Sequence, residues 1–296
     1  MPSSVPTRGH VIALIALLSL LWGSTWIVIA GGLRDLPPFT SAAARFLIAA
    51  LAMSAIAPAI ARREGGSRAP WKLGFVLGTL NFGASYAIVY WTETHLPSGI
   101  VSVLWAVFPM LMAASSSWFL AGETLTARQW AGFTLGFAGV ALLFATDLHD
   151  FGAHGIPAAG MLLVSPIVSC IGTVVLKREG KGVSSALVNR DAMWIGAAIL
   201  TTLAFAFERH ASPEWTPRAI GSVVYLALAG TVLTFSLYFW LLRNTEAWRL
   251  STISYVTPAV ALLLGTFVGN EPFTRWTLAG SLTILAGVVL ATFRPR

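Results

Sequence analysis

The sequence predicts an all-α polytopic membrane protein with ten transmembrane helices, built as two inverted five-helix repeats. Three observations lead to this prediction: the composition, the spacing of the apolar segments, and a match between the two halves of the chain. Of the 296 residues, 56% are hydrophobic and only 10% are charged, and the mean hydropathy is +0.75. Such a chain has more apolar surface than a water-soluble core can bury, so its solvent must be lipid.

The apolar segments have the length that a membrane span requires. A hydrocarbon core of ~30 Å needs roughly 20 apolar residues in a helix, and runs of this length occur five times in each half of the chain. We therefore divide the chain into a first repeat, 1–150, and a second repeat, 151–296. The expected helices are 11–32, 38–60, 71–92, 97–120 and 127–146 in the first repeat, and 155–176, 184–207, 217–242, 247–269 and 274–293 in the second.

The two halves match in sequence at a fixed offset. Glu123 and Glu271 lie 148 residues apart, and the glycines that follow each glutamate repeat that offset. Those glycines are Gly132 and Gly139 in the first half, and Gly280 and Gly287 in the second. Because each repeat has an odd number of helices, the second copy must enter the membrane from the opposite side, and the repeats are inverted.

The basic residues indicate a membrane topology. The net charge is +7, but Lys and Arg are scattered over the connectors and form no basic face, so we expect no nucleic-acid partner. With a cytoplasmic N-terminus, thirteen Lys and Arg residues lie on the inner side and four on the outer side. This bias predicts that both termini are cytoplasmic. The single cysteine, Cys170, excludes a disulfide framework.

Prolines inside the expected helices indicate positions that line a cavity. A proline removes the hydrogen bond to residue i−4, so Pro109 frees the carbonyl of Trp105 and Pro258 frees that of Ser254. In a membrane such a kink is tolerated where it faces protein or water. The alternative is a packing kink without ligand contact.

Aromatic and small polar side chains at helical spacing complete the candidate binding site. Trp22 and Trp26 share one helix face, as do Tyr86 and Tyr90. A Tyr hydroxyl or Trp N–H needs a partner, which the bundle interior supplies better than lipid. The other candidates are Trp105, Tyr238, Tyr255, Asn81, Ser165 and Ser254. Interfacial belts for the aromatic residues and bonds to their own helix backbone for the hydroxyls remain alternatives.

Two arginines lie well inside the expected spans. Arg45 and Arg190 occupy near-equivalent places in the two repeats, and we expect structural anchors, with binding of a substrate carboxylate as the alternative. Glu123 and Glu271 are expected to fix loops and helix ends.

All five His lie outside the spans, and the acidic residues lie in connectors or near helix ends, apart from Asp191 beside Arg190, so no carboxylate or imidazole relay crosses the membrane. This pattern predicts no catalytic residue, no metal and no cofactor. The glycines expected to allow close helix approach, as a scaffold or a dimer seam, are Gly132, Gly136, Gly280 and Gly287. Monomer and homodimer both stay open.

Four segments carry a resemblance to a known family. They are Leu21-Trp22-Gly23-Ser24, Arg45-Phe46, Pro109 to Glu123, and Pro258 to Glu271, in which Asn270 stands where Gly is common. Together they resemble the drug/metabolite transporter superfamily, in its ten-helix branch of two EamA-type repeats. The aromatic-rich middle of the chain is similar to bacterial aromatic amino acid exporters of that superfamily. The resemblance implies a multi-pass protein of the bacterial inner membrane with a central cavity and alternating access.

The resulting expectation is an exporter of small metabolites in contact with the lipid bilayer. Aromatic or hydrophobic amino acids and similar flat solutes are the expected substrates, moved by a facilitator, because the predicted interior is aromatic and lacks an acidic relay. Drugs, nucleobases and other metabolites are the alternative cargo. A membrane receptor or assembly protein without transport is a further alternative. An intramembrane enzyme would need clustered carboxylates, His or a nucleophile–base pair, and the spans hold none.

Overall fold

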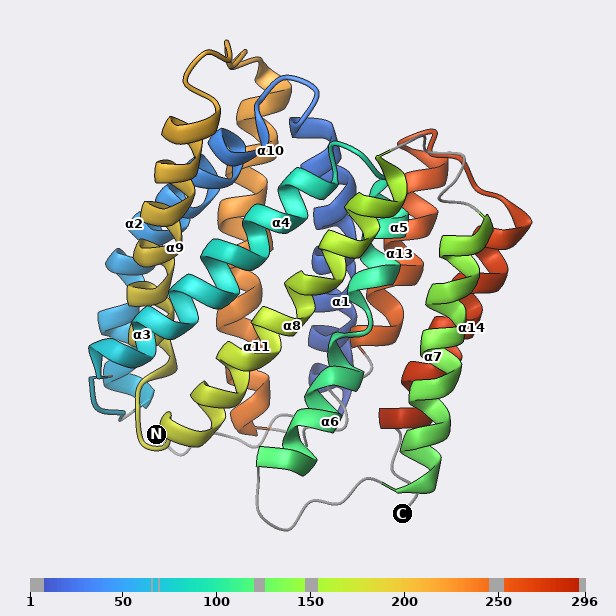
Figure 1. The fold of residues 1–296 in the computed structure, drawn as a ribbon. Helices are drawn as coiled ribbons and strands as arrows, with labels where there is room; N and C mark the ends of the chain where they lie inside the picture. Colours follow the sequence, from blue (N-terminus) through green and yellow to red (C-terminus); the bar gives the residue numbers. More distant parts are fainter. Residues whose placement is uncertain are drawn as a thin grey trace.

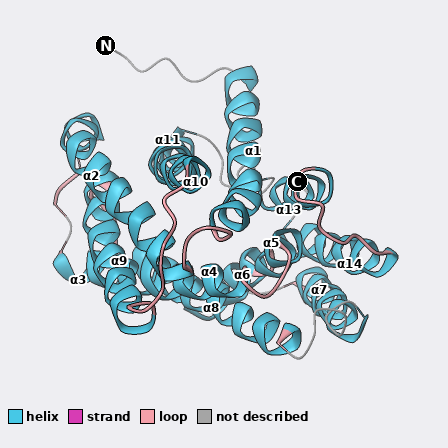
Figure 2. Cartoon of the chain, turned by 90° about the horizontal axis from the view of Figure 1, so that it is seen from above, coloured by secondary structure: helices cyan, strands magenta, loops and turns pink. Residues whose placement is uncertain are grey.

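The computed structural model describes residues 8–64, 66–68, 70–119, 126–146, 154–244 and 253–292. Within these ranges the chain is helical, and its one β interaction is an isolated parallel bridge between Ser67 and Val183. The helices stand side by side in a bundle, which Figure 1 shows from the side and Figure 2 from above. The all-α membrane fold follows from these elements.

The helices follow the order expected from the apolar segments. In the first half they are α1 (Arg8–Gly32), α2 (Pro38–Glu64), α3 (Trp71–Leu77), η1 (Gly78–Ala84), α4 (Ser85–Thr92), α5 (Ser98–Trp105), α6 (Phe108–Phe119) and α7 (Ala127–Thr146). In the second half they are α8 (Gly155–Glu179), α9 (Ser185–Phe207), α10 (Pro217–Ala227), η3 (Leu228–Leu233), α11 (Thr234–Asn244), α13 (Ile253–Phe267) and α14 (Arg275–Thr292).

Six helical segments are long and apolar enough to cross a membrane. They are Gly9–Gly32, Pro38–Arg63, Trp71–Thr92, Gly155–Glu179, Ser185–Phe207 and Pro217–Tyr238, and each coincides with an expected span. Shorter apolar helices cover Ser98–Met112, Val256–Phe267 and Arg275–Leu290. The full count of ten spans therefore stays a prediction, as does the boundary between the repeats at residue 150.

The expected helix 97–120 is divided into α5 and α6. A turn at Ala106 and Val107 separates them, and α6 begins at Phe108, so Pro109 falls in its first turn. A first-turn proline is tolerated because the N–H it lacks has no intrahelical acceptor there. Proline thus positions the break. Pro258, in contrast, lies inside the continuous helix α13.

Two of the spans contain a π-helical stretch, η1 in the first repeat and η3 in the second. The two stretches begin at Gly78 and Leu228, close to the repeat offset seen in the sequence. A π-helical turn is wider than an α-helical one and occurs often at functional sites. Both stretches lie in the middle of their spans, where they face the bundle interior through buried residues such as Phe82 and Thr231.

Glycines join α7 and α14, which lie beside each other at one edge of the bundle (Figure 2). A Cβ on Gly287 would lie 2.6 Å from the carbonyl oxygen of Gly132 and 2.7 Å from Cα of Gly136. A Cβ on Gly139 would lie 2.8 Å from the carbonyl oxygen of Gly280. These glycines therefore serve helix packing within the chain.

One end of the bundle, here called the outer end after the predicted topology, carries the loops 33–37, 93–97, 208–216 and 268–274. α1 begins and α14 ends at the opposite end (Figure 1). The orientation of these two ends in the membrane stays a prediction.

Candidate functional site

A buried arginine lies where α2 packs against α4 and η3. Arg45, on α2, is 1% exposed and donates three hydrogen bonds. Nε donates to Oγ1 of Thr231 at 2.9 Å, Nη1 to the hydroxyl of Tyr90 at 3.3 Å, and Nη2 to the carbonyl oxygen of Gly230 at 3.3 Å. Gly230 and Thr231 belong to η3, so the π-helical stretch supplies two of the three acceptors.

The partners of Arg45 are all electrically neutral. Among the residues that the structure describes, no carboxylate forms an ion pair with this guanidinium. A buried cation without a counter-charge is costly, and such groups inside membranes mark functional sites by default. Arg45 is therefore able to accept an anionic group.

Aromatic rings surround the guanidinium on one side. The carbon atom of the Arg45 guanidinium lies 4.8 Å from the ring centroid of Tyr86 and 5.6 Å from that of Phe46, within range of a cation–π interaction. Phe46 and Tyr86 lie 4.7 Å apart, and Phe82 lies 5.4 Å from Phe46. Phe235 continues the series, 5.4 Å from Phe82.

Trp22 extends this series along α1. Its ring lies 5.9 Å from Phe235 and 5.4 Å from Tyr238. We call the connected set the aromatic network; its members are Trp22, Phe46, Phe82, Tyr86, Phe235 and Tyr238. Trp22, Tyr86 and Tyr238 are only partly buried, so their faces are not fully covered by protein. Tyr86 and Tyr90 thus contact Arg45 directly, whereas Trp22 and Tyr238 are connected to it through the rings of Phe235 and Phe82.

Trp105 lies in a second cluster, next to the break before Pro109. Its Nε1 donates to Oγ of Ser165 at 3.1 Å, and this hydroxyl also pairs with Oγ of Ser85 at 2.7 Å. The Trp105 ring stacks on Phe108 at 4.9 Å and lies 6.4 Å from Trp26. Nε1 of Trp26 is buried with no hydrogen-bond acceptor among the described residues.

Asn81 connects η1 to α8. Its Nδ2 donates to the carbonyl oxygen of Ser169 and to Oγ1 of Thr173, both at 3.1 Å. Its Oδ1 lies against Gly172, where any side chain larger than glycine would collide with it. Asn81 thus holds two helices together, while Oδ1 itself is buried without a donor in the described part of the chain.

Several predicted site residues lie away from Arg45 or outside the residues that the structure describes. Pro258 is buried in α13. The side chains of Ser254 and Tyr255, and all of Glu123, lie outside the described residues. The surroundings of Arg190 differ from those of Arg45. Nε and Nη2 of Arg190 donate to Oδ1 of Asp191 at 2.8 and 2.6 Å, and both side chains are partly exposed. An exposed pair of this kind contributes little to stability.

Two glutamates cap helices at the outer end. Oε1 of Glu271 accepts from the backbone N–H and the hydroxyl of Ser98 at 2.8 and 2.6 Å, and Oε2 accepts from the N–H of Gly99 at 3.0 Å, at the start of α5. Asn270, with φ of 52°, forms the turn before Glu271, and Asn adopts this conformation more readily than most residues. Glu208 accepts in the same way from the N–H groups of Phe39 and Thr40 at 2.7 Å, at the start of α2. Carboxylates at helix N-termini satisfy free N–H groups and favour the helix dipole.

An ion pair links two outer loops. The carboxylate of Asp35, after α1, accepts from Oγ1 of Thr216 at 2.6 Å and from the guanidinium of Arg218. These hydrogen bonds lower the pKa of Asp35 from 3.8 to about 2. Asp35 thus stays ionised, and the contact intact, down to strongly acidic pH.

Glu93 is the functional candidate that the sequence analysis missed. It directly follows α4, is 7% exposed, and neither carboxylate oxygen has a hydrogen-bond donor in the described ranges. Burial and the nearby Glu271 raise the pKa of Glu93 well above its usual value. The spacing of Tyr86, Tyr90 and Glu93, at i, i+4 and i+7, places all three on one helix face and is the signal that would have identified it.

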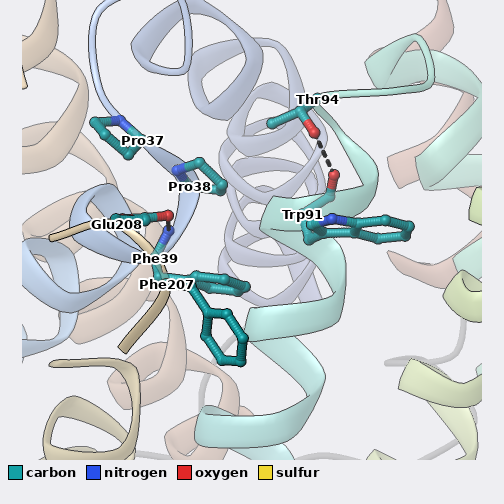
Figure 3. A pocket seen from close by; sticks show the side chains of 7 residues that line it. All are labelled: Pro37, Pro38, Phe39, Trp91, Thr94, Phe207 and Glu208. Atoms are coloured by element: carbon teal, nitrogen blue, oxygen red, sulfur yellow. Dashed lines mark hydrogen bonds between the residues drawn. The ribbon is translucent and has the colours of Figure 1, made fainter. Parts of the chain in front are cut away.

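A crevice of about 500 Å³ opens at the outer end (Figure 3). Its lining residues are Pro37, Pro38, Phe39, Trp91, Thr94, Phe207 and Glu208. The rings of Phe39 and Phe207 lie 6.1 Å apart on one of its sides. It shares no lining residue with the aromatic network, so we treat it as a surface feature of the outer end.

The family follows from comparison with known proteins. A model of the EamA-like transporter family matches residues 9–145 and 156–293. The chain belongs to the EamA-like transporter family. The two matches confirm the resemblance to two EamA-type repeats.

Three bacterial proteins that are similar to this chain have names that describe transporters or an efflux pump. The uncharacterized inner membrane transporter YedA of Escherichia coli strain K12 is 29% identical, over 93% of this chain and 88% of its own. The uncharacterized transporter YvbV of Bacillus subtilis is 28% identical, over 96% and 92%. A probable amino-acid metabolite efflux pump of Salmonella typhimurium is 28% identical, over 95% and 94%.

A solved crystal structure has the same fold. It matches with a TM-score of 0.68 at 19% identity and covers 97% of this chain and 98% of that one. At this identity the likeness concerns the fold alone. The family, the relatives and the apolar spans together make this chain a multi-pass inner membrane transporter.

Proposed function

We propose that this transporter exports aromatic and hydrophobic amino acids and similar flat metabolites across the inner membrane. The observation that carries the proposal is the pairing of Arg45, a buried cation with only neutral partners, with the aromatic network beside it. An amino acid with a ring side chain offers a carboxylate to the cation and an apolar face to the rings. The name of the Salmonella relative, an amino-acid metabolite efflux pump, is in keeping with this substrate class.

Each part of the site has a role in the proposed binding mode. The Arg45 guanidinium binds the substrate carboxylate in place of, or together with, Tyr90 and Thr231, which hold the side chain ready when the site is empty. Trp22 and Tyr86 contact the substrate ring. The two inverted repeats form the central cavity and expose it to each side in turn, with both termini cytoplasmic, as the sequence predicts.

The transporter acts as a facilitator in this proposal, so that the substrate gradient drives net flux. Its support is the sequence, in which no His, and no acidic residue other than Asp191 beside Arg190, lies in the interior of the expected spans, so no relay of acidic groups crosses the membrane. Nucleobases, drugs and other flat metabolites are the second candidate class, because a stack of aromatic rings accepts a purine as readily as an indole. The buried cation favours the amino acids, since neutral bases do not use it.

The test is counterflow in proteoliposomes. Vesicles preloaded with unlabelled tryptophan are given radiolabelled tryptophan or phenylalanine outside, with and without a pH gradient. We expect accelerated uptake that does not require the gradient, and a strong loss in Trp22→Ala, which removes a ring proposed to contact the substrate. The matched control is Trp130→Ala, because Trp130 is 54% exposed on α7 and faces away from the core. If the folded protein transports adenine but no amino acid, the substrates are nucleobases and related flat metabolites and not amino acids.

A further inference from the structure

Glu93 is a buried carboxylate that the proposed binding mode does not use. It lies in the turn after α4, is 7% exposed, and both of its oxygens are fully covered. It occupies the same helix face as Tyr86 and Tyr90, which contact Arg45 through the ring and the hydroxyl, respectively. Its carboxyl group therefore lies at the inner side of the outer-end loop 93–97, on the helix face that leads to the candidate binding site.

The groups around Glu93 do not neutralise an ionised carboxylate. α2 contributes Arg45, which acts through space but forms no ion pair with Glu93, and α4 contributes the neutral Tyr90. α1 contributes only the backbone amide of Ala30, which favours the ionised form but does not form a hydrogen bond of normal geometry with either carboxylate oxygen. The loop between α13 and α14 contributes Glu271, a second carboxylate whose oxygens are engaged by Ser98 and Gly99. On its own loop, Nδ1 of His95 pairs with Thr94 and the carbonyl oxygen of Trp91.

A carboxylate in this position is stable in one of two ways. An unpaired charge out of water is costly, so the group either binds a cation or takes up a proton. A metal ion needs several ligands, and the described residues contain no group of three His, Cys, Asp or Glu side chains that would hold one. The remaining ligand is the proton.

We propose that Glu93 is a proton-binding site that couples opening of the outer end to pH. When the Glu93 carboxylate is buried, as in this structure, it binds H⁺ to become a neutral carboxylic acid, and we assign this arrangement to the closed outer end. When the outer end opens, water hydrates the group, the O–H bond breaks, and the proton passes to water on that side. The proton is taken up again on closure.

The sign of the pH dependence follows from this cycle. The pKa of Glu93 is raised by burial and by Glu271 in the closed state, and returns toward its ordinary value on hydration. Protonation of Glu93 therefore stabilises the closed state fully at pH values below the ordinary pKa of a glutamate. This stabilisation is lost as the pH rises through the raised pKa of the closed state. Between the two values, one proton is released for each opening, which changes the opening equilibrium by up to about tenfold per pH unit.

The first test observes the proton directly and needs no substrate. Infrared spectra of the protein in liposomes are recorded across about pH 5 to pH 8, where exposed carboxylates are ionised. We expect a C=O band of a protonated carboxyl that is lost in Glu93→Gln and retained in Glu214→Gln, an exposed control in an outer loop. A spectrum that is the same in Glu93→Gln as in the wild type would overturn the proposal.

The second test measures opening. Leu96 is buried in the same loop, so Leu96→Cys, in a Cys170→Ala background, reacts with a maleimide only when the outer end opens. In the double variant Leu96→Cys with Glu93→Gln, the labelling rate should rise with pH only because the thiol titrates. With Glu93 present, we expect an additional rise of up to about tenfold per pH unit. Equal slopes would show that Glu93 does not couple protonation to opening. Neither test depends on the proposed substrate class, so failure of amino acid counterflow leaves both readouts intact.

Discussion

Replacement of Arg45 by Met separates carboxylate recognition from structural support. Met keeps an unbranched side chain of similar length and removes the charge, and a buried charge replaced by an apolar group of similar volume often leaves stability unchanged. The variant does leave the acceptors Tyr90, Thr231 and Gly230 without the guanidinium. Oγ1 of Thr231 retains a bond to the carbonyl oxygen of Leu226 at 2.8 Å, which limits the loss.

The magnitude follows from the proposed contact with the substrate carboxylate. Truncation of one partner in a buried, hydrogen-bonded charge pair costs about 2–5 kcal/mol of binding free energy. Since 1.4 kcal/mol is a factor of ten, tryptophan should bind at least ~30-fold more weakly to Arg45→Met. Tryptophan methyl ester, which lacks the carboxylate charge, should lose much less.

The assay is competition binding to the purified protein. Radiolabelled phenylalanine is displaced by tryptophan or by its methyl ester in the wild type, in Arg45→Met, and in the control Arg190→Met. The wild type and the control should prefer the free acid, and Arg45→Met should show little preference. Size-exclusion chromatography establishes that each variant is folded. An Arg45→Met protein that is folded and still prefers the free acid would refute carboxylate recognition by Arg45.

Three further predictions concern packing, capping and pH. Gly287→Val should separate α7 from α14 and destabilise the protein by about 1–3 kcal/mol. The control Gly160→Val, at a position with open space, should have little effect. Thermal unfolding in detergent compares the two variants, and equal melting temperatures would contradict the packing of α7 on α14. Glu271→Ala should cost about 1 kcal/mol through the lost cap of α5, and Glu271→Gln less, measured in the same way. Asp35→Asn should leave the pH dependence of Leu96→Cys labelling between about pH 5 and pH 8 unchanged, because the pKa of Asp35 lies at about 2 and its contribution is lost only as pH falls through that value.

The sequence predicted the helical framework well because hydrophobicity over about 20 residues is a strong signal. The glycines of α7 and α14 were identified as close-packing positions, but the sequence left open whether they join helices within the chain or between two copies. The structure places Gly287 against Gly132 and Gly136 of the same chain. The spacing of glycines in a sequence does not determine which helix packs against them.

The candidate site was predicted only in part, for physical reasons. The sequence singles out Trp22, Tyr86, Tyr90 and Tyr238 because their polar edges need partners inside a membrane, and their role in substrate binding stays a prediction. Phe82 and Phe235 carry no polar atom, so nothing in the sequence distinguished them from lipid-facing phenylalanines.

The charged residues show the same limit. Arg45 and Arg190 have near-equivalent sequence positions, yet one is buried among neutral groups and the other pairs with Asp191, because helix rotation decides which way each points. Glu93 resembled a connector residue, and only its helix register placed it inside.

A structure determined with bound tryptophan is the most direct test of the account. We predict that the tryptophan carboxylate lies within hydrogen-bonding distance of the Arg45 guanidinium, and that the indole ring contacts Tyr86 or Trp22. Tryptophan bound elsewhere, with Arg45 still held by Thr231, Tyr90 and Gly230 alone, would contradict it.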